Sequence, residues 1–164
     1  MQRRYIERIP KLKGLSCGSR IAFIRQLRGM TQQELGLAIG LENDKIRNRI
    51  CRYEKGGRIP KKDKIEKIAK ALDVSEGMIR AYDFRNPSDF LYEMFWVEEL
   101  MPDFAFALRK RFNPEEETTM YFTRAYKDWR KEQIKLEKNL ISRREYIEWK
   151  LNYELEWKGG DNDE

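Results

Sequence analysis

Five polar side chains suited to binding anions and base edges lie within eight residues, in the stretch DKIRNRICRYEKG at 44–56. Arginine can donate two parallel hydrogen bonds to guanine, asparagine can both donate to and accept from adenine, and lysine pairs with phosphate. The chemistry that these residue types support is recognition of a polyanion. The candidate base-reading residues are Lys45, Arg47, Asn48, Arg49 and Arg52.

The same stretch has an apolar periodicity that would place these side chains on one side of a helix. With 100° per residue, Ile50 and Tyr53 fall within about 40° of Ile46. The opposite side carries Asn48, Arg52 and Lys55, flanked by Lys45 and Arg49. We therefore expect a helix over about 44–55, with its apolar side seated on its own domain and its cations facing outward.

Residues that could support catalysis are scarce. The chain has no histidine, the commonest general base and metal ligand, and its two cysteines, Cys17 and Cys51, lack metal-ligand spacing. The carboxylates are dispersed among lysines, and there is no glycine-rich phosphate loop. We expect no enzyme activity, no metal and no cofactor; an enzyme in the C-terminal half is the weakest alternative.

Charge is distributed unevenly along the 164 residues. Positions 1–62 hold 16 Lys and Arg against 5 Asp and Glu, whereas positions 63–164 hold 18 against 23. A basic front and an acidic back indicate a polyanion-binding domain followed by a second module. No apolar run reaches the roughly 18 residues that a membrane helix needs, and the basic N-terminus lacks an apolar signal region. We expect a cytoplasmic protein without membrane contact.

The first half of the chain predicts five short helices in a compact domain over 16–84, after a basic arm over 1–15 with little to bury. A first helix starts at about Ser16 and ends at Gly29. Thr31 and Glu34 form a capping-box pattern that opens a second helix. The basic helix is the third, a fourth runs from about Lys61, and a fifth covers about 75–82.

The second half predicts an α+β module over 88–157, after a boundary at RNPSD (85–89) and before a loose acidic tail at 158–164. Segment 90–101 is helical with apolar residues on more than one face, so we expect it to be buried at a dimer interface or under a hairpin. Residues 104–112 and 118–122 predict the two strands of that β-hairpin. Helices follow over 126–139 and from Ser142, which has capping-box spacing to Glu145.

The segments IAFIRQLRGMTQQELGLAIG, RICRYEKGGRIP and IEKIAKALDVS resemble the Cro/cI-type helix-turn-helix family, often called the Xre family, over roughly residues 16–82. This resemblance implies a five-helix, lambda-repressor-like fold whose third helix reads the major groove of double-stranded DNA. It also implies an internal salt bridge between Arg25 and Glu54. Base-reading roles for Arg47, Asn48, Arg49 and Arg52 follow from aligning the family motif backwards from Glu54.

Phosphate contacts are expected around the basic helix. The resemblance implies a phosphate contact for Gln32 at the start of the second helix. We expect another for Gln33, the next residue. The cations outside the reading positions suit the same role as a group: Lys11, Lys13, Lys55, Arg58, Lys61 and Lys62. Each neutralised phosphate should add about 0.9 to the salt dependence of binding.

One departure from the family pattern lies before the basic helix. Glu54 follows Gly40 by 14 positions, about one helical turn more than is usual, with the extra residues within LENDKIRN. Either the helix begins a turn earlier or the connecting loop is larger. The whole chain is also similar, through looser motifs, to small regulators of Gram-positive bacteria near mobile elements.

These observations predict a homodimeric, sequence-specific DNA-binding transcriptional regulator, with repression favoured over activation. The C-terminal module would dimerise the protein and hold any site for a small-molecule or protein effector. Two alternatives remain open beside it. An antitoxin-like or anti-repressor protein would act through a partner bound by the acidic C-terminal half, and an RNA-binding protein would use the same basic surface.

Overall fold

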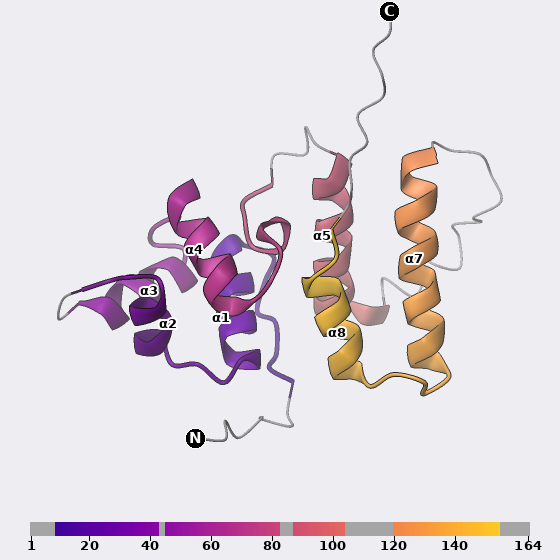
Figure 1. Cartoon of the computed structure of the whole chain (residues 1–164), viewed down its shortest axis with the longest axis horizontal. Helices are drawn as coiled ribbons and strands as arrows, with labels where there is room; N and C mark the ends of the chain where they lie inside the picture. The colour runs from indigo at the N-terminus through magenta and orange to yellow at the C-terminus, as the bar shows by residue number, and fades with distance from the viewer. Residues whose placement is uncertain (1–8, 43–44, 83–86, 104–119, 155–164) are drawn as a thin grey trace, which may run out of the picture.

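The computed structural model describes residues 9–42, 45–82, 87–103 and 120–154, and every element within them is helical. The first half contains α1 (Cys17–Leu27), α2 (Gln32–Ala38), α3 (Ile46–Glu54), α4 (Lys62–Leu72) and a single 3₁₀ turn, η1 (Glu76–Met78). The second half contains α5 (Pro87–Leu100), α7 (Met120–Glu137) and α8 (Arg143–Leu151). In Figure 1, α2 and α3 lie at one end of the molecule and α7 at the other.

The predicted helix starts coincide with local capping groups. The Ser16 and Thr31 side chains accept hydrogen bonds from the backbone N–H groups of Ser19 and Glu34. The Glu34 carboxylate in turn accepts from the Thr31 backbone N–H, which completes the capping box. Ser142 and Glu145 form the same box at the start of α8. The first donors of these helices are therefore satisfied by side chains next to them in the sequence.

Two glycines allow α3 to approach its neighbours closely. A Cβ at Gly18 in α1 would lie 2.2 Å from the Tyr53 carbonyl oxygen, and one at Gly36 in α2 would lie 2.1 Å from Ile46 Cγ2. Ile46, Ile50 and Tyr53 are buried beneath α3. The short α3 is thus held along its apolar side by α1 and α2, and its own nine residues could not hold a helix alone.

Helix α5 joins the two halves of the molecule. Trp96 donates from Nε1 to the Met78 carbonyl oxygen at 2.9 Å, and its ring meets Phe23 edge-on at 5.6 Å between centroids. On the other side, the Phe95 ring lies 5.3 Å from Trp129 of α7 and 5.7 Å from Trp149 of α8. The apolar surface expected at a dimer interface or under a hairpin is therefore largely covered within one chain, although Phe90 and Met101 remain 47% and 43% exposed.

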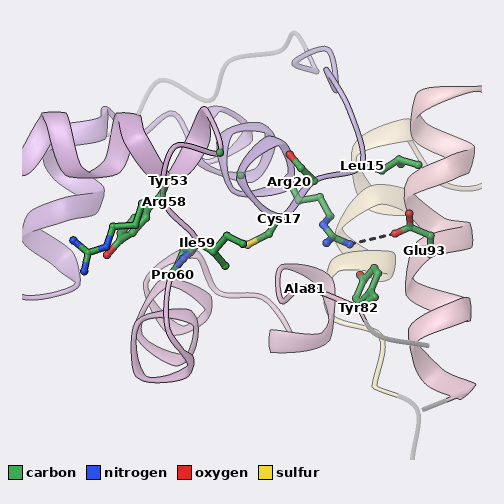
Figure 2. A pocket seen from close by; sticks show the side chains of 13 residues that line it. Leu15, Cys17, Arg20, Tyr53, Arg58, Ile59, Pro60, Ala81, Tyr82 and Glu93 are labelled. Atoms are coloured by element: carbon green, nitrogen blue, oxygen red, sulfur yellow. Dashed lines mark hydrogen bonds and ion pairs between the residues drawn. The ribbon is translucent and has the colours of Figure 1, made fainter. Parts of the chain in front are cut away.

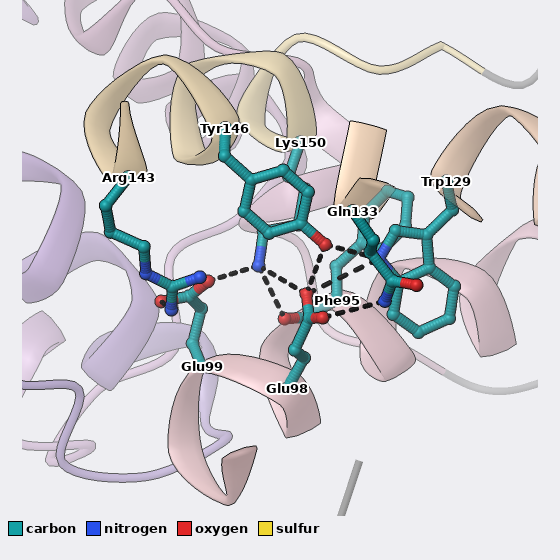
Figure 3. A network of polar contacts seen from close by, with 8 residues as sticks. All are labelled: Phe95, Glu98, Glu99, Trp129, Gln133, Arg143, Tyr146 and Lys150. Atoms are coloured by element: carbon teal, nitrogen blue, oxygen red, sulfur yellow. Dashed lines mark hydrogen bonds and ion pairs between the residues drawn. The ribbon is translucent and has the colours of Figure 1, made fainter. Parts of the chain in front are cut away.

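A buried polar network crosses the contact of α5, α7 and α8 (Figure 3). The Lys150 ammonium lies 3.0 Å from Glu98 Oε2, also contacts Glu99, and is 1% exposed. Glu98 accepts hydrogen bonds from Tyr146 Oη at 2.7 Å and from Gln133 Nε2 at 2.9 Å. Each buried charge therefore has several polar partners, as a stable buried ion pair requires.

Two opposing effects act on the pKa of Glu98. Burial alone would raise it, but the Lys150 charge and the hydrogen bonds from Tyr146, Lys150 and Gln133 outweigh burial and lower it below the ordinary 4.5. Burial is also the largest cause of the raised pKa of Tyr146, followed by the charge of Glu98. The network thus favours an ionised Glu98 beside a neutral Tyr146.

The predicted β-hairpin is not supported by the structure. No strand occurs in the parts of the chain that are described, and residues 120–122 of the expected second strand form the first turn of α7. Residues 104–119 lie outside the described ranges. Aromatic residues at 121–122 suggested a strand, but β-propensity depends on context, and here the segment continues into a long helix that begins six residues before position 126.

Three smaller expectations also need correction. The fifth helix is only the 3₁₀ turn η1. The basic arm is expected to bury little, but in its described part, 9–15, Leu12 is 4% exposed and belongs to the hydrophobic core. Helix α7 ends at Glu137, and Asn139, expected inside the helix, has a left-handed φ of 56°. The Asn139 backbone N–H donates to the Leu136 carbonyl oxygen, and the Leu140 backbone N–H donates to the Lys135 carbonyl oxygen. This pair of hydrogen bonds is a common helix-ending pattern.

The close approach at Gly18 leads to a stability prediction. Gly18→Ala should lower the free energy of unfolding by about 1 to 3 kcal/mol, because the new methyl group meets a backbone carbonyl of α3 that cannot rotate away. Gly57→Ala is the control, since its Cβ would have no neighbour nearer than 3.7 Å. Urea denaturation followed by circular dichroism measures both. A Gly18→Ala protein as stable as the wild type would contradict this packing.

The Glu98 network predicts an acid-sensitive stability. Because its folded-state pKa is lowered, Glu98 stabilises the fold fully above the ordinary value of 4.5, and this contribution disappears as pH falls through the lower folded-state pKa. Glu98→Gln should reduce stability at neutral pH and flatten its fall in acid. Glu66→Gln, on an exposed position of α4, should leave the profile unchanged. Urea denaturation across the acidic range tests this, and identical slopes for Glu98→Gln and the wild type would refute it.

Candidate nucleic-acid interface

The outward side of α3 is a cationic surface. Arg47, Asn48 and Arg52 are exposed and Arg49 is half-buried, whereas Ile46, Ile50 and Tyr53 on the inner side are buried. Lys45 is exposed at the N-cap position, just outside the helix, and Lys55 is exposed at the C-cap. The structure therefore brings all five candidate base-reading residues onto or beside one helix of about 14 Å, the length of roughly nine residues.

The extra residues before α3 lie in the connection. Helix α2 ends at Ala38 and α3 begins only at Ile46. Of the two alternatives, an earlier start of the helix and a larger connecting loop, the structure therefore has the larger loop. Leu41 is buried in the core and holds the first part of this loop down. Residues 43–44 lie outside the described ranges.

An ion pair fixes the C-terminal end of α3. Arg25 Nε lies 2.5 Å from Glu54 Oε1, and Arg25 Nη2 lies 3.1 Å from Glu54 Oε2. Arg25 Nη1 also donates to the Met30 carbonyl oxygen at 2.5 Å. The two side chains are only 11% and 8% exposed. The bidentate contact links α1, the turn after it and α3, as the family resemblance implies for this pair.

Gln32 belongs to the same network. Its Nε2 donates to Glu54 Oε2 at 2.7 Å, and the residue is half-buried. The amide nitrogen carries two N–H groups, so one remains for a phosphate oxygen. Gln33, on the next position of α2, is exposed. The start of α2 is thus tied to the end of α3 through one carboxylate.

The expected phosphate-binding cations continue from α3 to α4. Arg58, Lys61 and Lys62 are exposed, as are Lys11 and Lys13. A notch of about 220 Å³ lies between the end of α3 and the start of α4. Its lining includes one acid, Asp63, which lies 3.7 Å from Lys64, and four cations: Arg49, Arg58, Lys61 and Lys64. Lys64 was not among the predicted site residues. The sequence pattern that could have identified Lys64 is the run KKDK, which places it one helical turn after Lys61.

Most of these cations lack acidic partners. Within the described ranges no ion pair involves Arg47, Arg49, Arg52, Lys55, Arg58, Lys61 or Lys62. By contrast, Arg25 and Arg28, on the inner part of the same half, are paired with Glu54 and Glu148. The outward surface therefore retains a positive potential that a polyanion can neutralise.

Comparison with known proteins supports this arrangement. Residues 21–79 match the family model described as Helix-turn-helix. The match runs from within α1 to just past η1 and covers less than half of the chain. No curated protein and no solved structure matches the chain. The match supports a DNA-binding helix-turn-helix domain in the first half. No described helix is long and apolar enough to cross a membrane.

The ion pair at the end of α3 leads to a mutational prediction. Glu54→Gln should lower the free energy of unfolding by about 3 to 5 kcal/mol, because it leaves the Arg25 guanidinium buried without a charged partner. Glu137→Gln removes the acid of an ion pair whose side chains are 38% and 51% exposed, so it should cost less than about 1 kcal/mol. Chemical denaturation of both variants checks this. Equal losses would mean that Arg25–Glu54 contributes no more than a surface pair.

Proposed function

We propose that the helix-turn-helix half of this protein binds double-stranded DNA in a sequence-specific manner, with α3 in the major groove. The observation that carries this proposal is the contrast between the two sides of α3. Its inner side is seated by Ile46, Ile50 and the Glu54 carboxylate, and its outer side presents Arg47, Asn48 and Arg52 without acidic partners among the described residues. Such a helix has donors for base edges and a rigid support behind them.

A DNA duplex suits this surface better than structured RNA. The major groove of B-DNA is about 12 Å wide and admits an α-helix, whereas that of A-form RNA is deep and narrow. Among the reading positions Arg47 and Arg52 favour guanine and Asn48 favours adenine. The cations of the α3–α4 notch lie to one side of these positions and would contact the adjacent phosphates.

The same proposal includes a homodimer that regulates transcription by repression. Helix-turn-helix proteins commonly pair over two half-sites about one turn of DNA apart, so that each monomer presents its helix to the same face of the duplex. The C-terminal helices are the proposed dimerisation element. Leu140, between α7 and α8, is 70% exposed and Met101, after α5, is 43% exposed, which leaves apolar side chains for such a contact.

Fluorescence anisotropy with labelled duplexes tests the proposal. The wild type should bind the DNA upstream of its own gene at least about 10³ times more tightly than a random duplex. Arg52→Ala should erase most of this difference, because a bidentate arginine–guanine contact contributes about 1 to 3 kcal/mol of discrimination at each half-site. Lys127→Ala removes an exposed cation of α7 and should leave the difference intact, which controls for net charge.

Salt dependence separates recognition from simple charge attraction. Variants of Lys61 or Lys62 should weaken binding to both duplexes alike and lower the slope of log affinity against log salt by about 0.9 for each lost contact. Weak binding that is equal on both duplexes and disappears with salt would refute sequence-specific recognition. The search would then turn to a protein partner of the C-terminal half.

A further inference from the structure

A second concave site lies behind the DNA-facing surface. This pocket, of about 360 Å³, is bounded by the start of α1, the turn that follows α3, residues 81–82 and α5. Figure 2 shows Arg58 and Tyr53 at one end of the pocket and Arg20 and Glu93 at the other, with Cys17 and Ile59 between them. Its volume is in the range of small-molecule sites.

Arg20 has more donors than acceptors at the inner end of this pocket. The residue is 2% exposed, and its Nε–H is buried without a hydrogen-bond partner within the described structure. Its Nη2 donates to the Arg80 carbonyl oxygen at 3.0 Å, and its Nη1 is 3.4 Å from Glu93 Oε2. That last distance is long for a charge-assisted hydrogen bond, which is usually below 3 Å.

The Glu93 carboxylate is a weak counter-ion for Arg20. Its side chain is 22% exposed, and burial raises its pKa although Arg20 acts in the opposite direction. The Arg20 guanidinium also lies over the Tyr82 ring, 4.1 Å from its centroid, which orients it without neutralising it. A buried guanidinium with one poorly placed anion retains affinity for a second acceptor.

The rest of the pocket is mainly apolar. Leu15, Ile59, Pro60 and Tyr53 contribute to its walls, and Ile59 is 71% exposed at present. The Cys17 thiol has its pKa raised by burial, so it adds no negative charge at neutral pH. An apolar body would cover Ile59, while an anionic group at the other end would reach Arg20. The two ends together define an amphipathic ligand.

We propose that this pocket binds a compact organic anion, with its apolar body against Ile59 and Pro60 and its anionic group paired with Arg20, and that this ligand weakens DNA binding. The regulatory part rests on the proposed function. The pocket wall is the turn that carries Arg58 and leads to Lys61, both of which line the notch for phosphate. A ligand there places its apolar body behind the turn that carries these cations, with its charge at the Arg20 end, and DNA must weaken the ligand by the same factor.

The ligand site is tested first, with full-length protein and two fluorescent probes. Anilinonaphthalene sulfonate has an apolar body and one anionic group, and phenylnaphthylamine has the same rings without the charge. The sulfonate should bind one site per chain, and about tenfold or more tightly than the neutral probe, because only the sulfonate can pair with Arg20. Failure of the sulfonate to bind, or equal affinity of the two probes, would overturn the assignment.

Two variants locate the site and its charge requirement. Ala81→Trp places a large ring in the pocket from an exposed position and should weaken sulfonate binding by about tenfold or more, whereas Glu66→Trp, on an exposed position of α4 outside the pocket, should not. Glu93→Gln removes the existing counter-ion of Arg20 and should tighten binding of the sulfonate but not of the neutral probe. A sulfonate affinity that is unchanged in both Ala81→Trp and Glu93→Gln would overturn the proposal.

The effect on DNA is measured in the same proteins with a far-red labelled duplex. Saturating sulfonate should weaken duplex binding by at least about fivefold in the wild type and in Glu66→Trp, and much less in Ala81→Trp. An unchanged duplex affinity would overturn the regulatory part alone. A wild type that binds no duplex without any probe would instead refute the proposed function, and the probe titrations would still decide whether the pocket is an anion site.

Discussion

The bidentate contact between Arg25 and Glu54 is the interaction on which the recognition surface depends. It joins the end of α1 to the end of α3, and the same carboxylate holds Gln32 at the start of α2. Because α3 has only nine residues, it cannot keep its orientation by helix propensity. Burial of Ile46 and Ile50 limits the tilt of α3, and the Arg25–Glu54 ion pair limits movement of its C-terminal end. The exposed cations are thus presented by a rigid element.

The arginines of α1, its C-cap and α3 divide into two groups that differ in position although they share one chemistry. Arg20 and Arg25 of α1 and Arg28 at its C-cap are turned inward, where carboxylates or backbone carbonyl oxygens accept their hydrogen bonds. The arginines of α3 are turned outward. A buried guanidinium needs nearly all of its donors satisfied, whereas an exposed one is hydrated until a ligand displaces the water. This division separates the cations that hold the fold from those that can bind DNA.

The two halves are mechanically connected through α5. Its residues contact η1 and α1 on one side and α7 and α8 on the other, and the Glu98–Lys150 network gives that second contact a defined geometry. Arg28, at the C-cap of α1, also bonds to Glu148 of α8 and to the Leu72 carbonyl oxygen. A ligand or partner that shifts α5 would therefore act on α1, against which α3 is packed. The pocket beside Arg20 is lined by residues of α1 and α5, and α1 packs directly against α3.

Sequence alone determined the features that depend on neighbouring residues. The capping boxes at Thr31 and Ser142 and the apolar and cationic sides of α3 follow from short spacings. The family match over residues 21–79 confirms the predicted helix-turn-helix. Tertiary structure decided the rest. Residues 120–122 are helical despite their aromatic character, and Arg20 is buried although its spacing resembles that of any surface arginine. The pocket joins residues separated by up to about 80 positions, and such contacts leave no local pattern because packing, not spacing, brings them together.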